Sequence, residues 1–109
     1  MYISITGIKV KSFFGMLKFM RDTTPSLAEA RKTNGNLFCD SKKINKYYHT
    51  LTAWEDRNKM MDYLRGKHHA LAMKNFRSIG TGSVYGYEDD SMPNWEDVIK
   101  KWKQNFKEI

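Results

Sequence analysis

Alternation of polar and apolar residues predicts strands along this chain. In "YISITGIKV" (2–10), Ile3 and Ile5 point to one face, and the other face carries Tyr2, Ser4, Thr6, Ile8 and Val10. In "KYYHTLTAW" (46–54) the two faces carry Tyr47, His49, Leu51 and Ala53, and Tyr48, Thr50, Thr52 and Trp54. Residues 36–40 and 82–88 are two further strands. The polar link "SKKIN" joins 36–40 to 46–54 as a hairpin.

Helical spacing predicts three helical segments between and after these strands. Ser12 is a plausible N-cap for a first helix whose apolar stripe is Phe13, Met16, Leu17 and Met20. We expect a restart at Thr24-Pro25 and an end at Gly35. Asp56 is a candidate cap for the second segment, which bends at Gly66. The tail after Pro93 predicts a last helix with an apolar stripe of Trp95, Val98, Ile99, Trp102 and Phe106.

The order β-α-β-β-α-β with an extra C-terminal helix predicts a ferredoxin-like α+β fold with an antiparallel sheet. We expect one domain over 1–109, with 1–90 as the ferredoxin-like unit and 91–109 as the C-terminal helix. Two helices cover one face of such a sheet. We assign that face to Ile3, Ile5, Leu51 and Ala53. The opposite face, rich in Tyr, Thr and Trp, would then stay open, which predicts a homodimer whose sheets enclose a cavity.

Composition supports a single soluble domain. The 109 residues are 40% hydrophobic and 28% charged, with a formal net charge of +7. The basic residues are spread over the chain and match no nucleic-acid signature, so we expect no specific nucleic-acid partner. No apolar run is long enough to span a membrane, and residues 1–10 lack the apolar block of a signal peptide. Since Cys39 is the one cysteine, no internal disulfide is possible. We therefore expect a cytoplasmic protein without a membrane partner.

The paired histidines in "GKHHALAM" (66–73) are the strongest candidates for chemistry. His69 shares a helical face with Ala72, Met73 and Phe76, whereas His68 is rotated by about 100° toward solvent. Adjacent histidines do not converge on one metal ion, and no Cys or His elsewhere has ligand spacing, so we expect no metal site. His69 is either a packed imidazole or a site residue. Cys39 has no basic partner in the sequence and is interpreted as a packing residue.

The stretch from Trp54 and Asp56 through Met60 and Met61 to His69-Ala-Leu-Ala72-Met73 resembles the dimeric α+β-barrel superfamily. This superfamily includes antibiotic-biosynthesis monooxygenase-like proteins, haem-degrading monooxygenases and, more loosely, spheroidene monooxygenase-like proteins. The resemblance covers about residues 2–88. It implies the fold, a homodimer and a barrel cavity for a small flat apolar molecule.

The haem-degrading pattern within this superfamily is not matched. It places Tyr63 where that branch has a tryptophan and Met73 where it has the axial histidine, and the first strand contains no asparagine. We therefore expect no cofactor, although Met73 remains a conceivable haem ligand.

Two hypotheses follow. The first is a monooxygenase, cofactor-independent or haem-using, with His69 as the catalytic residue. The cavity would be lined by Tyr48, Thr50, Thr52, Trp54, Tyr63, Met73 and Tyr85. The alternative is a non-catalytic dimeric module that binds a ligand or a partner through the same cavity.

Overall fold

The computed structural model describes residues 1–108, except for the side chains of residues 76–79. Over these residues the chain forms five strands and four helices. The strands are β1 (Tyr2–Val10), β2 (Asn36–Ile44), β3 (Tyr47–Trp54), β4 (Gly80–Glu88) and β5 (Lys107–Glu108). The helices are α1 (Phe13–Lys32), α2 (Arg57–Leu64), α3 (Lys67–Ile79) and α4 (Trp95–Asn105).

The strands form one antiparallel sheet in the order β2-β3-β1-β4-β5. Its first four strands have the ferredoxin-like order, so the predicted fold class is confirmed. β2 extends four residues beyond the predicted strand, to Ile44. A tight turn follows, in which Asn45 adopts a positive φ of 56°. The "SKKIN" segment is therefore mostly strand, because its first four residues continue the pairing of β2 with β3.

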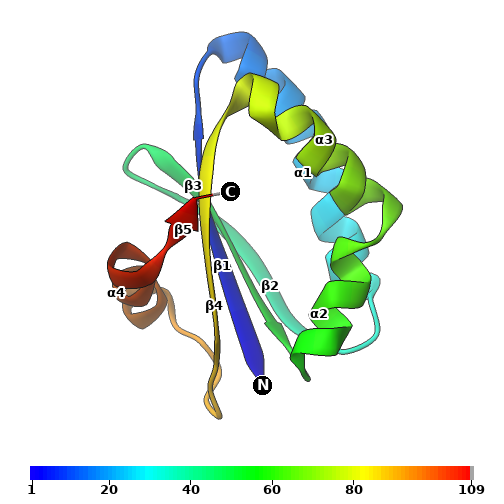
Figure 1. Cartoon of the computed structure of the whole chain (residues 1–109), viewed down its shortest axis with the longest axis vertical. Coiled ribbons are helices and arrows are strands. Elements are labelled where there is room, and N and C mark those ends of the chain that lie inside the picture. Colours follow the sequence, from blue (N-terminus) through cyan, green and yellow to red (C-terminus); the bar gives the residue numbers. More distant parts are fainter. Residues whose placement is uncertain (109) are drawn as a thin grey trace.

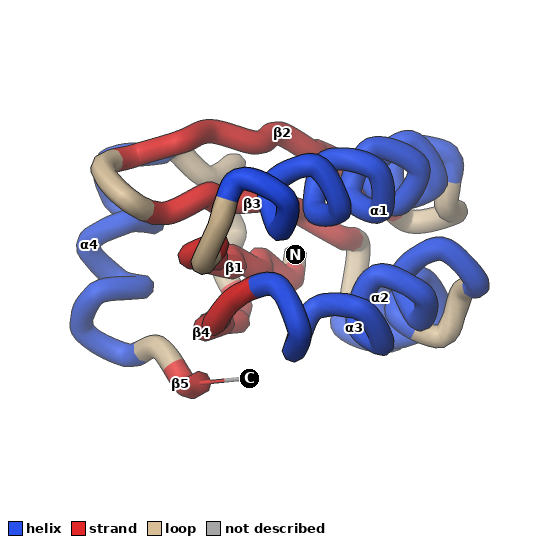
Figure 2. The backbone as a smooth tube through the Cα atoms, turned by 90° about the horizontal axis from the view of Figure 1, so that it is seen from above, coloured by secondary structure: helices blue, strands red, loops and turns tan. Residues whose placement is uncertain are grey.

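Helices cover both faces of the sheet. Helices α1, α2 and α3 lie on one face and α4 lies on the other (Figures 1 and 2). The prediction for the two faces was wrong. Ile3, Ile5, Leu51 and Ala53 pack against Val98, Ile99 and Trp102 of α4, whereas α1–α3 cover the hydroxyl-rich face. The apolar face of the sheet therefore packs on the apolar stripe of α4. The hydroxyl-rich face becomes the floor of a cavity under α1–α3.

The α1 helix differs from the prediction in phase and in length. Ser12 caps it, accepting a hydrogen bond from the Gly15 amide at 3.0 Å, as predicted. The helix then continues through Pro25 without a restart, and Thr24 Oγ1 donates to the Met20 carbonyl at 2.9 Å. Its buried face consists of Gly15, Phe19, Asp22, Ser26 and Ala30, while Phe13, Leu17 and Met20 are exposed. Three of the four residues of the predicted apolar stripe are thus on the surface, whereas Met16 is half-buried and packs against Phe19.

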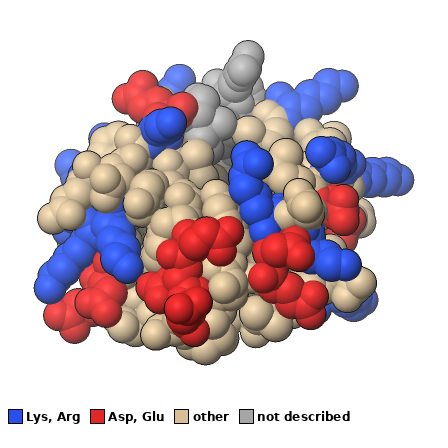
Figure 3. Space-filling view, turned by 60° about the horizontal axis from the view of Figure 1, so that its bottom comes forward, with Lys and Arg blue, Asp and Glu red and all other residues tan. Residues whose placement is uncertain are grey.

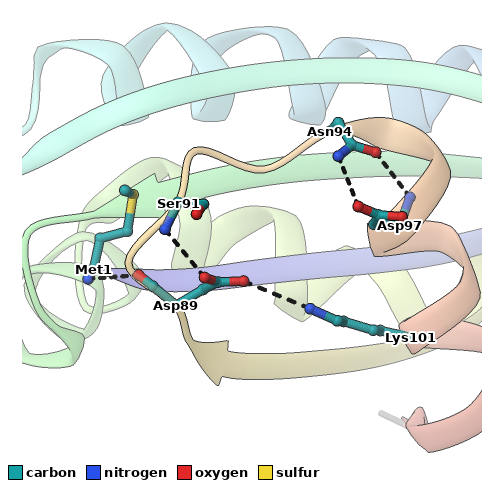
Figure 4. A network of polar contacts seen from close by, with 6 residues as sticks. All are labelled: Met1, Asp89, Ser91, Asn94, Asp97 and Lys101. Atoms are coloured by element: carbon teal, nitrogen blue, oxygen red, sulfur yellow. Dashed lines mark hydrogen bonds and ion pairs between the residues drawn. The ribbon is translucent and has the colours of Figure 1, made fainter.

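Polar contacts fix the entry into α4 (Figure 4). The amino group of Met1 donates to the Asp89 carbonyl oxygen at 2.9 Å, and the Ser91 amide donates to Asp89 Oδ1 at 3.1 Å. Lys101 of α4 pairs with Asp89 Oδ2 at 3.6 Å. Asn94 caps α4 by accepting from the Asp97 amide at 2.9 Å. The helix is therefore tied to the N-terminus and to the end of β4.

Candidate functional site

A cavity of about 120 Å³ lies between the sheet and α1–α3. Hydroxyl side chains from the two central strands, together with Ile8 of β1, form its floor. The register places Ser4 opposite Thr52 and Thr6 opposite Thr50, so two cross-strand pairs present their hydroxyls side by side: Ser4, Thr6, Thr50 and Thr52. The sequence alternation predicted that these residues share a face. Tertiary packing made that face the inner one.

The helices supply apolar walls with a few polar groups. α1 contributes Phe19, Asp22, Thr23, Ser26 and Leu27, α2 contributes Met60, Tyr63 and Leu64, and α3 contributes His69, Ala72 and Met73. Met73 is 37% exposed although it lines the cavity, so it lies at the mouth. An apolar enclosure with few convergent polar groups is the usual composition of a small-molecule site.

His69 faces the cavity and His68 does not. His69 is half-buried, and its ring meets Tyr63 edge-on with a centroid distance of 5.2 Å. Burial lowers the pKa of the His69 imidazole, against the opposing effects of a hydrogen bond to the Leu64 backbone and of Glu29. His69 is therefore neutral at pH 7 and able to accept a proton. The exposed His68 lies 4.0 Å from the Glu29 carboxylate. Phe76, placed on the His69 stripe by the sequence, lies outside the described side chains.

Tyr63 and Trp54 support the cavity wall. Tyr63 is buried and stacks on Trp54 with a centroid distance of 5.4 Å. Its hydroxyl donates to the Ser26 carbonyl at 3.1 Å and lies 2.6 Å from Ser26 Oγ. Burial raises the pKa of Tyr63, which keeps its hydroxyl neutral. Trp54 is fully buried behind Tyr63 and does not line the cavity.

Tyr48 and Tyr85 lie away from the cavity. Tyr48 packs behind Phe19 with a ring distance of 5.5 Å, on the same face of the sheet. Tyr85 lies on the opposite face, stacked on Tyr87 at 5.4 Å beside the α4 core. The sequence analysis predicted that Tyr85 lines the cavity together with Tyr48, because both are tyrosines on predicted strands. The register instead aligns Tyr85 with Ile5.

Asp22 is a cavity residue that the sequence analysis missed. Its carboxylate is buried, accepts a hydrogen bond from Asn75 Nδ2 of α3 at 3.1 Å, and pairs with Arg21 Nε at 3.2 Å. A polar residue on the Phe19–Asp22–Ser26–Ala30 face, at spacings of three and four, was the available signal. It was overlooked because the neighbouring stripe from Phe13 to Met20 contains larger apolar side chains.

The residues of the cavity do not fit a haem. The Tyr63 hydroxyl is already bound to Ser26, Met73 lies at the mouth, and a volume of about 120 Å³ is well below the 300–1,000 Å³ of pockets for drug-sized ligands. Among the described residues, no group of three His, Cys, Asp or Glu side chains lies close enough together to hold a metal ion. Burial also raises the pKa of the Cys39 thiol, which disfavours the reactive thiolate.

Comparison with known proteins identifies the fold. No family model matches the sequence, and no curated protein matches it either. Solved structures do. A candidate antibiotic biosynthesis monooxygenase from Nitrosomonas europaea has a TM-score of 0.74 at 14% identity, over 84% of this chain and 100% of that chain. A candidate antibiotic biosynthesis monooxygenase from Deinococcus radiodurans has a TM-score of 0.73 at 14% identity, over 86% of this chain and 97% of that one. SnoaB, a cofactor-independent oxygenase from Streptomyces nogalater, has a TM-score of 0.69 at 11% identity, over 84% of this chain and 94% of that one. The chain therefore has the fold of the antibiotic biosynthesis monooxygenase-like proteins, as the resemblance in residues 2–88 implied.

Proposed function

We propose that this protein is a monooxygenase-like enzyme that binds a small flat apolar molecule between its sheet and α1–α3. The observation that carries the proposal is the composition of the cavity. Apolar walls suit an apolar ring, and a row of hydroxyls on the floor supplies hydrogen bonds to an oxygen substituent. The neutral His69 imidazole at the same cavity supplies a base. The similarity in fold to SnoaB, a cofactor-independent oxygenase, and to a candidate monooxygenase supports the same reaction class.

The reaction that fits these groups uses the substrate itself as the reductant of O₂. His69 takes a proton from an acidic CH₂ beside a hydroxylated ring, and the carbanion gives its electrons to O₂. One oxygen atom stays as the new carbonyl, and the other leaves as water with the two hydrogens of the CH₂. The hydroxyls of Thr50 and Thr52 would orient the oxygen substituent of the substrate ring. The carboxylate of Asp22, held by Asn75, would accept a hydrogen bond from a second hydroxyl group of the substrate. No step needs a metal ion or an organic cofactor.

The size of the cavity limits the substrate. An apolar cavity of about 150 Å³ holds benzene, and this one is about 120 Å³. A single ring therefore fits with small side-chain adjustments. A larger ring system requires the flexible Met73 side chain at the mouth to move.

The alternative is a non-catalytic module that binds a ligand in the same cavity. The small volume and the Tyr63 hydroxyl already bound to Ser26 favour it, since they leave fewer free polar groups for chemistry. The enzyme hypothesis and the module hypothesis predict the same ligand binding, but only the enzyme hypothesis predicts turnover.

Oxygen uptake with phenolic CH₂ compounds of one to three rings, in the presence of a chelator, tests the proposal. We expect uptake by the native protein and its loss in His69→Gln, with binding retained. His68→Gln is the matched control, because the same change on the adjacent exposed residue should leave uptake intact. Saturable binding without uptake for every compound would favour the module. Uptake that is equal in native protein and His69→Gln would refute the role of His69.

We also propose a homodimer, but one that does not form through the hydroxyl-rich face of the sheet. The hydroxyl-rich face is covered by α1–α3 within one chain, so it is not available to a second sheet. What supports a dimer now is the stacked pair Tyr85 and Tyr87. Both remain only half-buried beside α4 on the other face.

A further inference from the structure

We propose that the N-terminal half of α1 docks the protein on an anionic lipid surface. This inference goes beyond the proposed function and does not rest on it. Four large apolar side chains lie in the open along the first two turns of this helix. Phe13 is 72% exposed, Phe14 76%, Leu17 54% and Met20 51%. Residues 13, 17 and 20 recur at helical spacing, so they form one ridge, with Phe14 beside it.

Exposed apolar side chains in such a group mark an interaction surface. Scattered single residues are normal on a protein, but a contiguous patch usually has a partner. The Phe13 and Phe14 rings contact each other edge-on with a centroid distance of 6.0 Å. The patch is therefore continuous at the start of α1.

The charges around this ridge select the kind of partner. Lys9, Lys11, Lys18 and Arg21 are all exposed, and the first acidic residue of the chain is Asp22, which is buried. Arg21 pairs with Asp22, whereas none of the ion pairs among the described residues includes Lys11 or Lys18. A helix with aromatic and aliphatic residues on one side and lysines along its border is the composition of interfacial helices that lie on anionic membranes.

Several acidic residues lie at the end of the molecule opposite to the start of α1. The start of α1 lies at the top of Figure 1, whereas Glu55, Asp56 and the segment 88–90 follow the strand ends at the bottom. Figure 3, viewed from that lower end, shows acidic side chains in the middle of this face, with Lys and Arg side chains around them. Because the chain has no acidic residue before Asp22, the start of α1 would meet a negatively charged surface with its lysines and without this acidic group.

This mode of contact requires no membrane span. Among the described residues no helix is long and apolar enough to cross a bilayer. An interfacial helix instead inserts its apolar ridge at the level of the lipid headgroups, and the lysines contact those headgroups. The sequence analysis expected no membrane partner because no apolar run is long enough to span a membrane. The structure adds that Phe13, Leu17 and Met20 of the predicted apolar stripe are exposed.

Sedimentation with phosphatidylcholine vesicles, with and without phosphatidylserine, tests this proposal on the full chain. We expect sedimentation with phosphatidylserine vesicles, little with phosphatidylcholine alone, and release by high salt. Phe13→Ser/Phe14→Ser should lower partitioning on the order of tenfold or more. Each charge reversal in Lys11→Glu/Lys18→Glu should lower it at least about fivefold.

Matched controls distinguish binding through the start of α1 from nonspecific adsorption to the vesicles. Leu71→Ser/Met92→Ser removes two exposed apolar side chains elsewhere, and Lys103→Glu/Lys107→Glu makes the same charge change beyond α1. Both controls should sediment like the native protein, and all variants should melt alike because the changed residues are exposed. Absence of sedimentation with phosphatidylserine vesicles, or an equal loss in the controls, would overturn the proposal. It would also be overturned if Phe13→Ser/Phe14→Ser left vesicle binding unchanged but converted a dimer into a monomer.

Discussion

His68 and His69 are neighbours in sequence with different environments. His68 is exposed, whereas His69 is half-buried against Tyr63 at the cavity. We expect His68→Ala to change the free energy of unfolding by no more than about 0.5 kcal/mol. His69→Ala should cost about 1–3 kcal/mol, because it removes buried volume and a hydrogen-bond partner. Urea unfolding of both variants checks this, and equal tolerance at the two positions would contradict the observed helix phase.

The buried imidazole of His49 and the half-buried imidazole of His69 make the free energy of unfolding depend on pH. Burial lowers the pKa of His49, which donates from Nδ1 to the Thr6 carbonyl at 3.0 Å, and burial also lowers the pKa of His69. The unfolded chain then binds more protons than the native state at pH values just below about 6.5. The resulting stability is fully present above that value and is lost as the pH falls through the native pKa values.

We therefore expect the urea midpoint to drop between about pH 7.5 and pH 5.5, above the range in which carboxylates titrate. His69→Gln should reduce this slope, because it removes one of the two imidazoles whose pKa is lowered. A midpoint that is constant over this range would contradict the prediction.

Gly7 and Trp102 determine how α4 sits on the sheet. A Cβ on Gly7 would collide with Cζ2 of Trp102, whose indole also meets His49 edge-on at 4.7 Å. Gly7→Ala should therefore cost about 1–3 kcal/mol through overpacking. Trp102→Leu makes room, so the double variant should lose less than the sum of the two single changes. Additive losses in this double-mutant cycle would show that the two residues do not compete for space.

The α4 helix is required to cover the sheet. Val98, Ile99 and Trp102 bury Ile3, Ile5 and Leu51, and Trp95 Nε1 donates to Asp40 Oδ2 of β2 at 2.9 Å. Truncation after Pro93 should expose this apolar face and cause aggregation or a clear loss of melting temperature. A truncated chain that melts like the full chain would contradict this account. Trp95→Phe is a milder variant, which loses the hydrogen bond to Asp40 alone.

Oligomeric state is a property of the whole molecule. If two copies associate through the Tyr85 and Tyr87 side of the sheet, light scattering at micromolar concentration should give twice the chain mass of 12.9 kDa. Tyr85→Ser/Tyr87→Ser should then give a monomer with an unchanged fold. A clean monomer from the native chain would refute the homodimer.

We still predict that the protein has no specific nucleic-acid partner.

Local patterns determined the elements of this protein and the type of its fold. Alternation located β1 and β3 and grouped Ser4, Thr6, Thr50 and Thr52 on one face. Asp56 capped its helix as predicted, accepting from the Lys59 amide at 2.9 Å. These features depend on neighbours a few residues apart, so the sequence contains all the information they require. The order of the elements then selected the ferredoxin-like topology, because few arrangements join them by short connections.

Tertiary structure alone decided which faces are buried and hence which residues meet at the cavity. Both faces of β1 contain enough apolar residues to be covered. Alternation therefore distinguishes the two faces but does not show which of them α1–α3 cover. On α1, the exposed ridge from Phe13 to Met20 is more apolar than the buried Phe19–Asp22–Ser26 face. The polar buried face is stable because Asn75 and Tyr63 supply hydrogen bonds from other helices, and those partners are 53 and 37 residues away along the chain. No local pattern encodes the pairing of these distant polar groups. This pairing placed Asp22 in the cavity and left the apolar ridge from Phe13 to Met20 exposed.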